Sequence, residues 1–130
     1  MPRLTADGRT VEVEEGTRLV RAIEGMGIRI GHRCGGNARC TTCRVVFQAG
    51  EPSTMTRAEY AKLRERDLLG QVRLACQIVC EHDMEVRVGL TVDSEGWPDA
   101  GPEPAAAVAP EPSWFTPDEL GREAADPERA

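Results

Sequence analysis

The sequence predicts an α+β fold, and the order and texture of its segments support this prediction. Short apolar or alternating runs typical of strands occur alongside two segments with apolar residues at helical spacing. Their order is strand, strand, helix, cysteine-rich loop, strand, helix, strand, which is typical of the α+β class. At 130 residues, the chain has room for one domain and an appendage.

The chain begins with a predicted hairpin and helix. Residues 3–6 and 10–14 flank Asp7-Gly8, a pair that suits a two-residue turn because both turn positions need a positive φ. Thr17 stands where a helix N-cap is expected. A helix over residues 18–25 follows, since apolar side chains recur at helical spacing at Leu19, Ala22, Ile23 and Met26.

The second half of the domain contains a strand, a helix and a further strand. Residues 44–48 form a mostly apolar run that predicts a buried strand. Thr56 and Glu59 have the spacing of a capping box, which predicts a helix over residues 57–66. Residues 84–88 alternate apolar and charged side chains, so we expect a strand with one buried face.

The composition changes near residues 92–97, which divides the chain into a domain over residues 1–92 and an extension over residues 93–130. The domain carries 14 basic and 12 acidic side chains, whereas the extension carries 2 basic and 10 acidic ones. The extension is rich in proline and alanine and cannot build a core of its own. We expect it to be irregular, with a short helix near residues 117–121 that begins at a proline.

The bulk properties exclude several classes of protein. A net charge of −6 argues against nonspecific nucleic-acid binding, which needs a basic footprint. The sequence has neither a signal-peptide pattern nor an apolar run of about 18 residues. We therefore expect a cytoplasmic monomer that binds no membrane. The odd count of five cysteines favours a metal or redox site over a disulfide framework.

Four of the cysteines have the spacing of an iron–sulfur site. Cys34, Cys40 and Cys43 follow the pattern C-x5-C-x2-C, and Cys76 comes after 32 further residues. A [2Fe–2S] cluster needs four thiolates, two for each iron, and one loop plus a distant segment can provide them. The cluster is an anion of about −2 when oxidised, and inward-pointing backbone N–H groups stabilise such a charge. Gly35 directly follows the first cysteine and suits a nest of this kind.

A zinc site is the other interpretation of the cysteines that remains open. Cys40, Cys43, Cys76 and Cys80 could instead form a tetrahedral zinc site in a structural interaction module, which would leave Cys34 unused. In the [2Fe–2S] interpretation Cys80 is the unused cysteine, and we expect it to be a small packed thiol. His32 and His82 are expected to be ordinary polar side chains, because a Rieske-type pair would need two histidines beside cysteines.

The cysteine-rich motif Cys34–Cys43 and the segment RLACQ around Cys76 resemble those of the plant- and vertebrate-type [2Fe–2S] ferredoxins. The resemblance covers roughly residues 1–92, and the five-residue first gap is similar to the adrenodoxin-like and bacterial iron–sulfur-assembly branch. It implies a β-grasp (ubiquitin-like) fold. It also implies that Cys34, Cys40, Cys43 and Cys76 hold a [2Fe–2S] cluster.

The resemblance further implies a function without catalysis. Such a protein carries one electron at a time between a reductase and an electron acceptor, and no side chain needs to act as an acid, a base or a nucleophile. An iron–sulfur sensor or scaffold is the alternative within the same cofactor class. Adrenodoxin-type proteins often have an acidic recognition helix after the cluster loop, whereas residues 57–67 carry four cations and three anions here.

Overall fold

The computed structural model describes residues 1–32, 35, 41–101, 104, 107–108 and 113–125, with side chains of the last helix described through residue 121. The strands are β1 (Arg3–Ala6), β2 (Arg9–Glu12), β3 (Thr17–Arg18), β4 (Arg44–Ala49), β5 (Met55–Thr56), β6 (Arg73–Leu74), β7 (Val79–Cys80), β8 (Met84–Val88) and β9 (Trp114–Phe115). The helices are α1 (Leu19–Gly25), α2 (Arg57–Glu65), the 3-10 turn η1 (Ala75–Gln77), α3 (Val92–Glu95) and α4 (Pro117–Ala125). None of the described helices has the length and apolarity needed to cross a bilayer.

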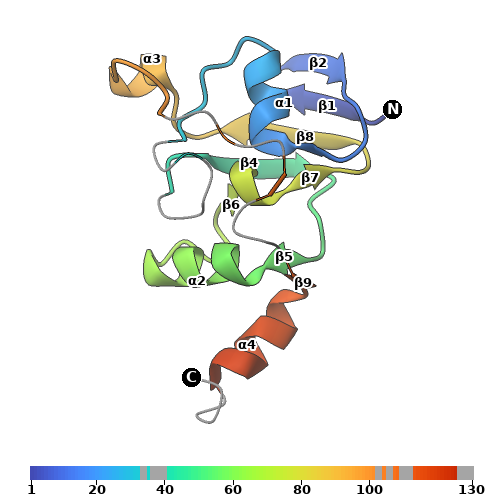
Figure 1. Ribbon diagram of the computed structural model, residues 1–130, viewed down its shortest axis with the longest axis vertical. Coiled ribbons are helices and arrows are strands. Elements are labelled where there is room, and N and C mark those ends of the chain that lie inside the picture. Colours follow the sequence, from blue (N-terminus) through green and yellow to red (C-terminus); the bar gives the residue numbers. More distant parts are fainter. Residues whose placement is uncertain (33–34, 36–40, 102–103, 105–106, 109–112, 126–130) are drawn as a thin grey trace.

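The largest sheet has the order β2-β1-β8-β4-β6, and helix α1 packs across it (Figure 1). The central pair β1 and β8 runs parallel, while β1–β2, β8–β4 and β4–β6 are antiparallel. This mixed sheet with a helix across it is a β-grasp fold, as the resemblance implies. The core lies between α1 and the sheet, where Leu19 and Ile23 are fully buried.

The predictions of the hairpin and of strands at residues 44–48 and 84–88 are confirmed, but β4 is not the buried strand that its apolar run predicts. Val45 is buried, whereas Val46 is 43% exposed, because successive side chains of a strand point to opposite faces. Asp7 and Gly8 have φ angles of 49° and 84° at the β1–β2 turn, as a two-residue turn requires. Strand β8 spans the predicted residues 84–88, with Met84 and Val86 buried and Glu85 exposed between them.

Two capping predictions need correction. Thr17 lies in β3 and its hydroxyl donates to the Glu14 carbonyl, so Arg18 is the N-cap residue of α1. At α2, Thr56 Oγ1 does accept the Glu59 N–H at 3.0 Å. The Glu59 carboxylate, however, does not complete the capping box, because it is buried and bound to Arg73. A buried guanidinium offers the carboxylate a stronger partner than the N-cap amide.

Described parts of the extension contact the domain at several points, and helix α4 lies beyond α2 at one end of the molecule (Figure 1). Near its start, the Ala100 carbonyl accepts the His32 N–H at 2.8 Å, and the Pro104 carbonyl accepts Arg21 Nη1 at 2.6 Å. Farther along, β9 pairs antiparallel with β5, and Leu120 of α4 is buried. The extension is therefore in contact with α1, with the start of the cysteine-rich loop and with the region of α2.

Candidate iron–sulfur site

Cys43 and Cys76 are brought together by the end of the β4–β6 ladder. Arg44 pairs with Leu74, and one step beyond this pair the Cys43 carbonyl accepts the Ala75 N–H at 3.0 Å. Both cysteines are buried, with exposed fractions of 1% and 0%. Two of the four predicted ligands thus lie on adjacent backbones although 32 residues separate them in the sequence. Cys34 and Cys40 lie outside the described residues.

The described parts of the cysteine-rich loop are held by hydrogen bonds at both ends of the loop. Gly35 has a φ of 73°, a conformation that favours glycine, and its N–H donates to the His32 carbonyl. At the other end of the loop, Arg44 holds Thr41 through two contacts, from Nε to the carbonyl at 2.9 Å and from Nη2 to the hydroxyl at 2.6 Å. Arg44 is half-buried, so it stabilises the loop rather than being fully solvated.

Two buried side chains contact Cys76 directly. Arg18 donates to the Cys76 carbonyl from Nε at 3.1 Å and from Nη2 at 2.5 Å. Gln77 Nε2 lies 3.6 Å from Cys76 Sγ and donates a hydrogen bond to it. Arg18 is 1% exposed and Gln77 is 0% exposed. The Gln77 donor suits a sulfur that becomes a negatively charged thiolate in a metal centre, while Arg18 holds the backbone of the same residue.

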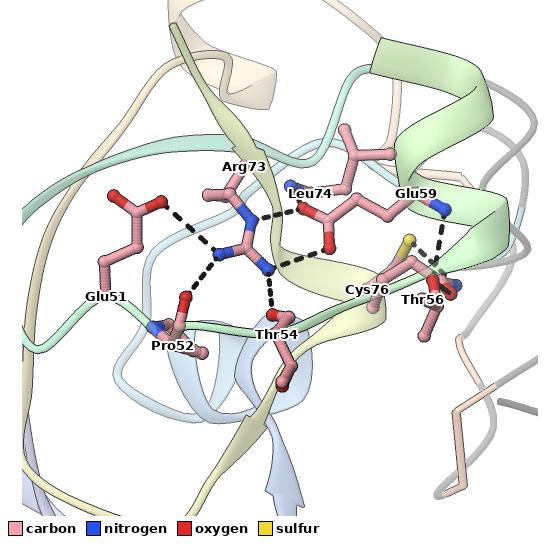
Figure 2. Close-up of polar contacts among 9 residues, drawn as sticks. Glu51, Pro52, Thr54, Thr56, Glu59, Arg73, Leu74 and Cys76 are labelled. Carbon is pink, nitrogen blue, oxygen red and sulfur yellow. Dashed lines mark hydrogen bonds and ion pairs between the residues drawn. The ribbon is translucent and has the colours of Figure 1, made fainter. Parts of the chain in front are cut away.

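An ion pair anchors the segment that leads to Cys76 (Figure 2). Arg73 of β6 donates to both carboxylate oxygens of Glu59, at 2.7 and 3.1 Å, and the Leu74 N–H donates to the same carboxylate at 2.9 Å. Arg73 also donates to the carbonyls of Pro52 and Thr54. Burial raises the pKa of Glu59, and the hydrogen bonds and charge of Arg73 oppose this rise.

Cys80 is as buried as Cys76 and belongs to the same core cluster, but it lies in a different element of secondary structure. It lies in β7 opposite Thr17, within the apolar core, and is 1% exposed. Burial raises the pKa of its thiol to about 11, so the side chain remains a neutral thiol at physiological pH. This environment agrees with the prediction of a small packed thiol.

The residues present fit a [2Fe–2S] cluster. Two buried cysteines lie on adjacent backbones, a glycine of positive φ follows the position of the first predicted ligand, and polar donors face the fourth. The buried Gln77 amide that donates to Cys76 Sγ would stabilise the negative charge of a thiolate ligand there. Among the described residues, no group of three or more His, Cys, Asp or Glu side chains forms a separate metal site.

Several of these contacts could not be recognised from the sequence alone. Arg18 is a polar residue beside an apolar run, and only the β3–β7 pairing places it next to Cys76. Gln77 directly follows Cys76, but the sequence does not show that its amide turns to the sulfur. The partial signals were the arginine before Leu74 in RLACQ and the half of the capping box that Thr56 and Glu59 form. Neither signal indicated that Glu59 turns inward to Arg73.

Comparison with known proteins gives a consistent result. The family model described as a 2Fe-2S iron-sulfur cluster binding domain matches residues 4–81. One subunit of the Na(+)-translocating NADH-quinone reductase of Chlamydia pneumoniae is 38% identical over 81 residues, 61% of this chain and 18% of that protein. Its counterpart in Chlamydia felis is 36% identical over 84 residues, 63% of this chain and 19% of that protein. The chain therefore spans about a fifth of the length of these curated relatives.

Solved structures of similar fold include both a single-domain protein and part of a larger one. An ISC-like [2Fe-2S] ferredoxin, FdxB from Pseudomonas putida, is 27% identical with a TM-score of 0.59, covering 68% of this chain and 93% of that one. The Amycolatopsis cytochrome P450 reductase GcoB is 25% identical with a TM-score of 0.54, covering 68% of this chain and 26% of that one. The same fold thus occurs as a whole protein and as part of a longer reductase chain.

Proposed function

Because the chain belongs to the family of 2Fe-2S iron-sulfur cluster binding domains, we propose that Cys34, Cys40, Cys43 and Cys76 hold its cluster and that it carries single electrons between redox partners. The observation that carries the ligand assignment is the pairing of Cys43 with the segment of Cys76, through the hydrogen bond from Ala75 to the Cys43 carbonyl. Cys80 is left out because it lies in β7 opposite Thr17, whereas the Cys43 backbone is hydrogen-bonded to the residue directly before Cys76.

The side chains around the site have supporting tasks. When bound, the cluster supplies one-electron oxidation and reduction at a potential that its surroundings adjust. Gln77 donates to the sulfur of Cys76, while Arg73 and Glu59 hold the strand before it. Burial of Cys43 and Cys76 keeps water from their sulfur atoms. None of these tasks is a proton transfer or a nucleophilic attack, so the domain acts as a carrier rather than as a catalyst.

The proposed partners are a reductase that supplies the electrons and an acceptor that takes them. The similar domains in an NADH-quinone reductase and in a cytochrome P450 reductase support this assignment. Helix α2 and the two residues that follow it expose three cations and two anions, so this surface is mixed in charge rather than acidic. These residues are Arg57, Arg64, Glu65, Arg66 and Asp67. We therefore propose that the partner surface that docks at α2 is acidic or mixed in charge.

Anaerobic purification followed by metal and sulfide analysis tests the cofactor. We expect about two iron atoms and two labile sulfides per chain, with a visible spectrum that bleaches on reduction. A colourless protein with stoichiometric zinc and no sulfide would instead establish the structural zinc module.

Electron exchange with a flavin-containing reductase tests the carrier role. We expect the cluster to be reduced rapidly and to pass its electrons on to cytochrome c in a coupled assay. A chain with an intact cluster that exchanges electrons only slowly with every reductase would instead be a sensor or a scaffold.

A further inference from the structure

Arg18 is a buried cation beside the proposed fourth ligand. The residue is 1% exposed, and two of its guanidinium nitrogen atoms donate to the Cys76 carbonyl. An arginine side chain does not lose its proton in a protein, so this position carries a full positive charge. Burial of such a charge is costly unless a compensating negative charge or several hydrogen bonds accompany it.

The backbone fixes Arg18 in this position from both sides. Strand β3 pairs with β7, and Arg18 lies opposite Val79. The Gly16 N–H donates to the Cys80 carbonyl at 2.8 Å, and the Leu19 N–H donates to the Ile78 carbonyl at 2.8 Å. Helix α1 begins directly after Arg18. The side chain therefore projects from a rigid junction toward η1, which contains Cys76.

A buried positive charge near the cluster favours one of its two redox states. Reduction adds one negative charge to a cluster that is already an anion. A fixed cation in a buried site attracts the added charge more strongly than a solvated cation does, because the local dielectric constant is lower and salt does not screen it. The charge of Arg18 should thus favour the reduced form and raise the reduction potential.

We propose that Arg18 is a positioning residue that holds the Cys76 segment through its carbonyl and raises the reduction potential of the cluster through its buried charge. This inference rests on the proposed function, since it requires the cluster to be held by Cys76. The cysteine motif alone does not indicate that a residue of β3 acts on the Cys76 segment and on the cluster.

The test compares neutral and cationic replacements of Arg18 with a matched surface variant. Arg18→Met removes the charge at similar length, and Arg18→Lys keeps the charge without the planar fork. Arg87→Met removes an equal charge from an exposed position on β8. The reduction potential of each purified holoprotein is measured by spectroelectrochemical titration, with iron and sulfide content determined on the same sample.

We expect Arg18→Met to lower the ratio of reduced to oxidised cluster at a fixed potential about tenfold, which is ~59 mV for a one-electron couple. Arg18→Lys and Arg87→Met should each remain within about twofold of the wild-type ratio. An unchanged potential in Arg18→Met would overturn the proposal. So would an equal fall in Arg18→Met and Arg18→Lys, because the charge would then be irrelevant.

Loss of the cluster in a variant is also informative. If Arg18→Met does not assemble a cluster, Arg18→Gln takes its place, because it keeps an amide donor for the Cys76 carbonyl but lacks the charge. The reduction potential of Arg18→Gln is then compared with that of the wild type in the same way. If both neutral variants are colourless and Arg18→Lys is coloured, the requirement for a buried cation is upheld. If Arg18→Lys is colourless as well, the proposal fails. A wild-type chain without iron and sulfide would refute the proposed function itself. The iron and sulfide analysis of the wild type therefore distinguishes this outcome from a failure of the role of Arg18.

Discussion

Arg73 and Glu59 form a fully enclosed ion pair, with the guanidinium Nε and Nη2 at 2.7 and 3.1 Å from the two carboxylate oxygens. The pair joins helix α2 to strand β6, three residues before Cys76 (Figure 2). Because the Leu74 N–H also donates to Glu59, the carboxylate holds both the side chain and the backbone of β6. The ion pair thus connects helix α2 to the segment that provides the proposed fourth ligand.

Removal of one member of this pair should be strongly destabilising. In Arg73→Met, Glu59 remains as a buried charge without its cation, and the expected loss is about 3–5 kcal/mol of unfolding free energy. Urea unfolding followed by far-UV circular dichroism measures the loss. The double variant Glu59→Leu/Arg73→Met removes both charges and should recover much of the loss. An equally unstable double variant would show that the unpaired charge is not the cause. Arg64→Met, on the exposed face of α2, is the control.

The Arg73→Met variant should also depend on pH in a defined direction. Burial raises the pKa of Glu59 above its ordinary value of 4.5, and this variant loses the Arg73 interactions that oppose the rise. A raised pKa in the folded state favours the protonated form. The contribution of the protonated Glu59 carboxyl to the stability of the folded state is therefore complete below pH 4.5. It is lost as the pH rises through the folded-state pKa of this group. The loss of unfolding free energy in Arg73→Met should be larger at pH 8 than at pH 5.5, as measured by urea unfolding at both pH values. A loss that is independent of pH would contradict this prediction.

Thr56 determines which end of the Gln77 amide faces the cysteine sulfur. Its hydroxyl oxygen accepts the Glu59 N–H at 3.0 Å, so its proton is available for the Gln77 Oε1 atom at 2.7 Å. The amide nitrogen then points to Cys76 Sγ. Thr56→Val should cost about 1 kcal/mol through loss of the helix cap and should lower the reduction potential, because a sulfur hydrogen bond is weakened. Thr56→Ser keeps the hydroxyl and should behave as the wild type. Equal potentials in the Val and Ser variants would contradict this account.

Cys76→Ser and Cys80→Ser should have opposite effects on the cluster. The first removes one of four proposed thiolate ligands, and we expect loss of most of the iron and the visible absorbance. The second replaces a packed thiol in the core, so the iron and sulfide contents should remain close to those of the wild type. Iron, sulfide and absorbance measured after anaerobic purification distinguish the two. If the Cys80 variant were the colourless one, the assignment of ligands would be wrong.

Cys80 should also be protected from alkylation. Burial raises the pKa of its thiol from 9.0 to about 11, so the folded state favours the neutral thiol. The resulting stabilisation is complete below pH 9 and is lost as the pH rises toward about 11. At pH 8 we expect iodoacetamide to modify Cys80 only after unfolding in urea, as measured by mass spectrometry of the digested chain. Rapid modification of the folded protein would contradict its burial.

The sequence allows prediction of those elements whose signals are local. The Asp7-Gly8 turn requires positive φ angles, and the alternation at residues 84–88 matches the two faces of one strand. Helix α2 is likewise predicted, with one residue of difference at its end, because its N-cap signal is strong.

The features that surround Cys76 depend on contacts between segments that are distant in the sequence. The hydrophobic periodicity of a segment indicates its local structure and does not predict such contacts. Arg18 reaches the Cys76 carbonyl across 58 residues of sequence because β3 pairs with β7. Thr17 has the residue type of an N-cap, but the same strand pairing moves the start of α1 one residue along the chain. Glu59 has the spacing of a capping box, yet a buried arginine 14 residues away takes its carboxylate. In each case a tertiary partner replaces the local one.

A chain that ends at Gly96 should fold but hold its cluster less firmly. The apolar core around α1 and the large sheet is built from residues 4–88, so the sheet does not depend on the extension. The extension does contribute the carbonyl of Ala100, which accepts the His32 N–H at the start of the cysteine-rich loop, and strand β9, which covers Met55. We therefore expect native-like circular dichroism and visible absorbance after truncation, with faster loss of absorbance in the presence of an iron chelator. An insoluble product would show that the extension belongs to the core, and an unchanged rate would show that its contacts with the loop do not stabilise the site.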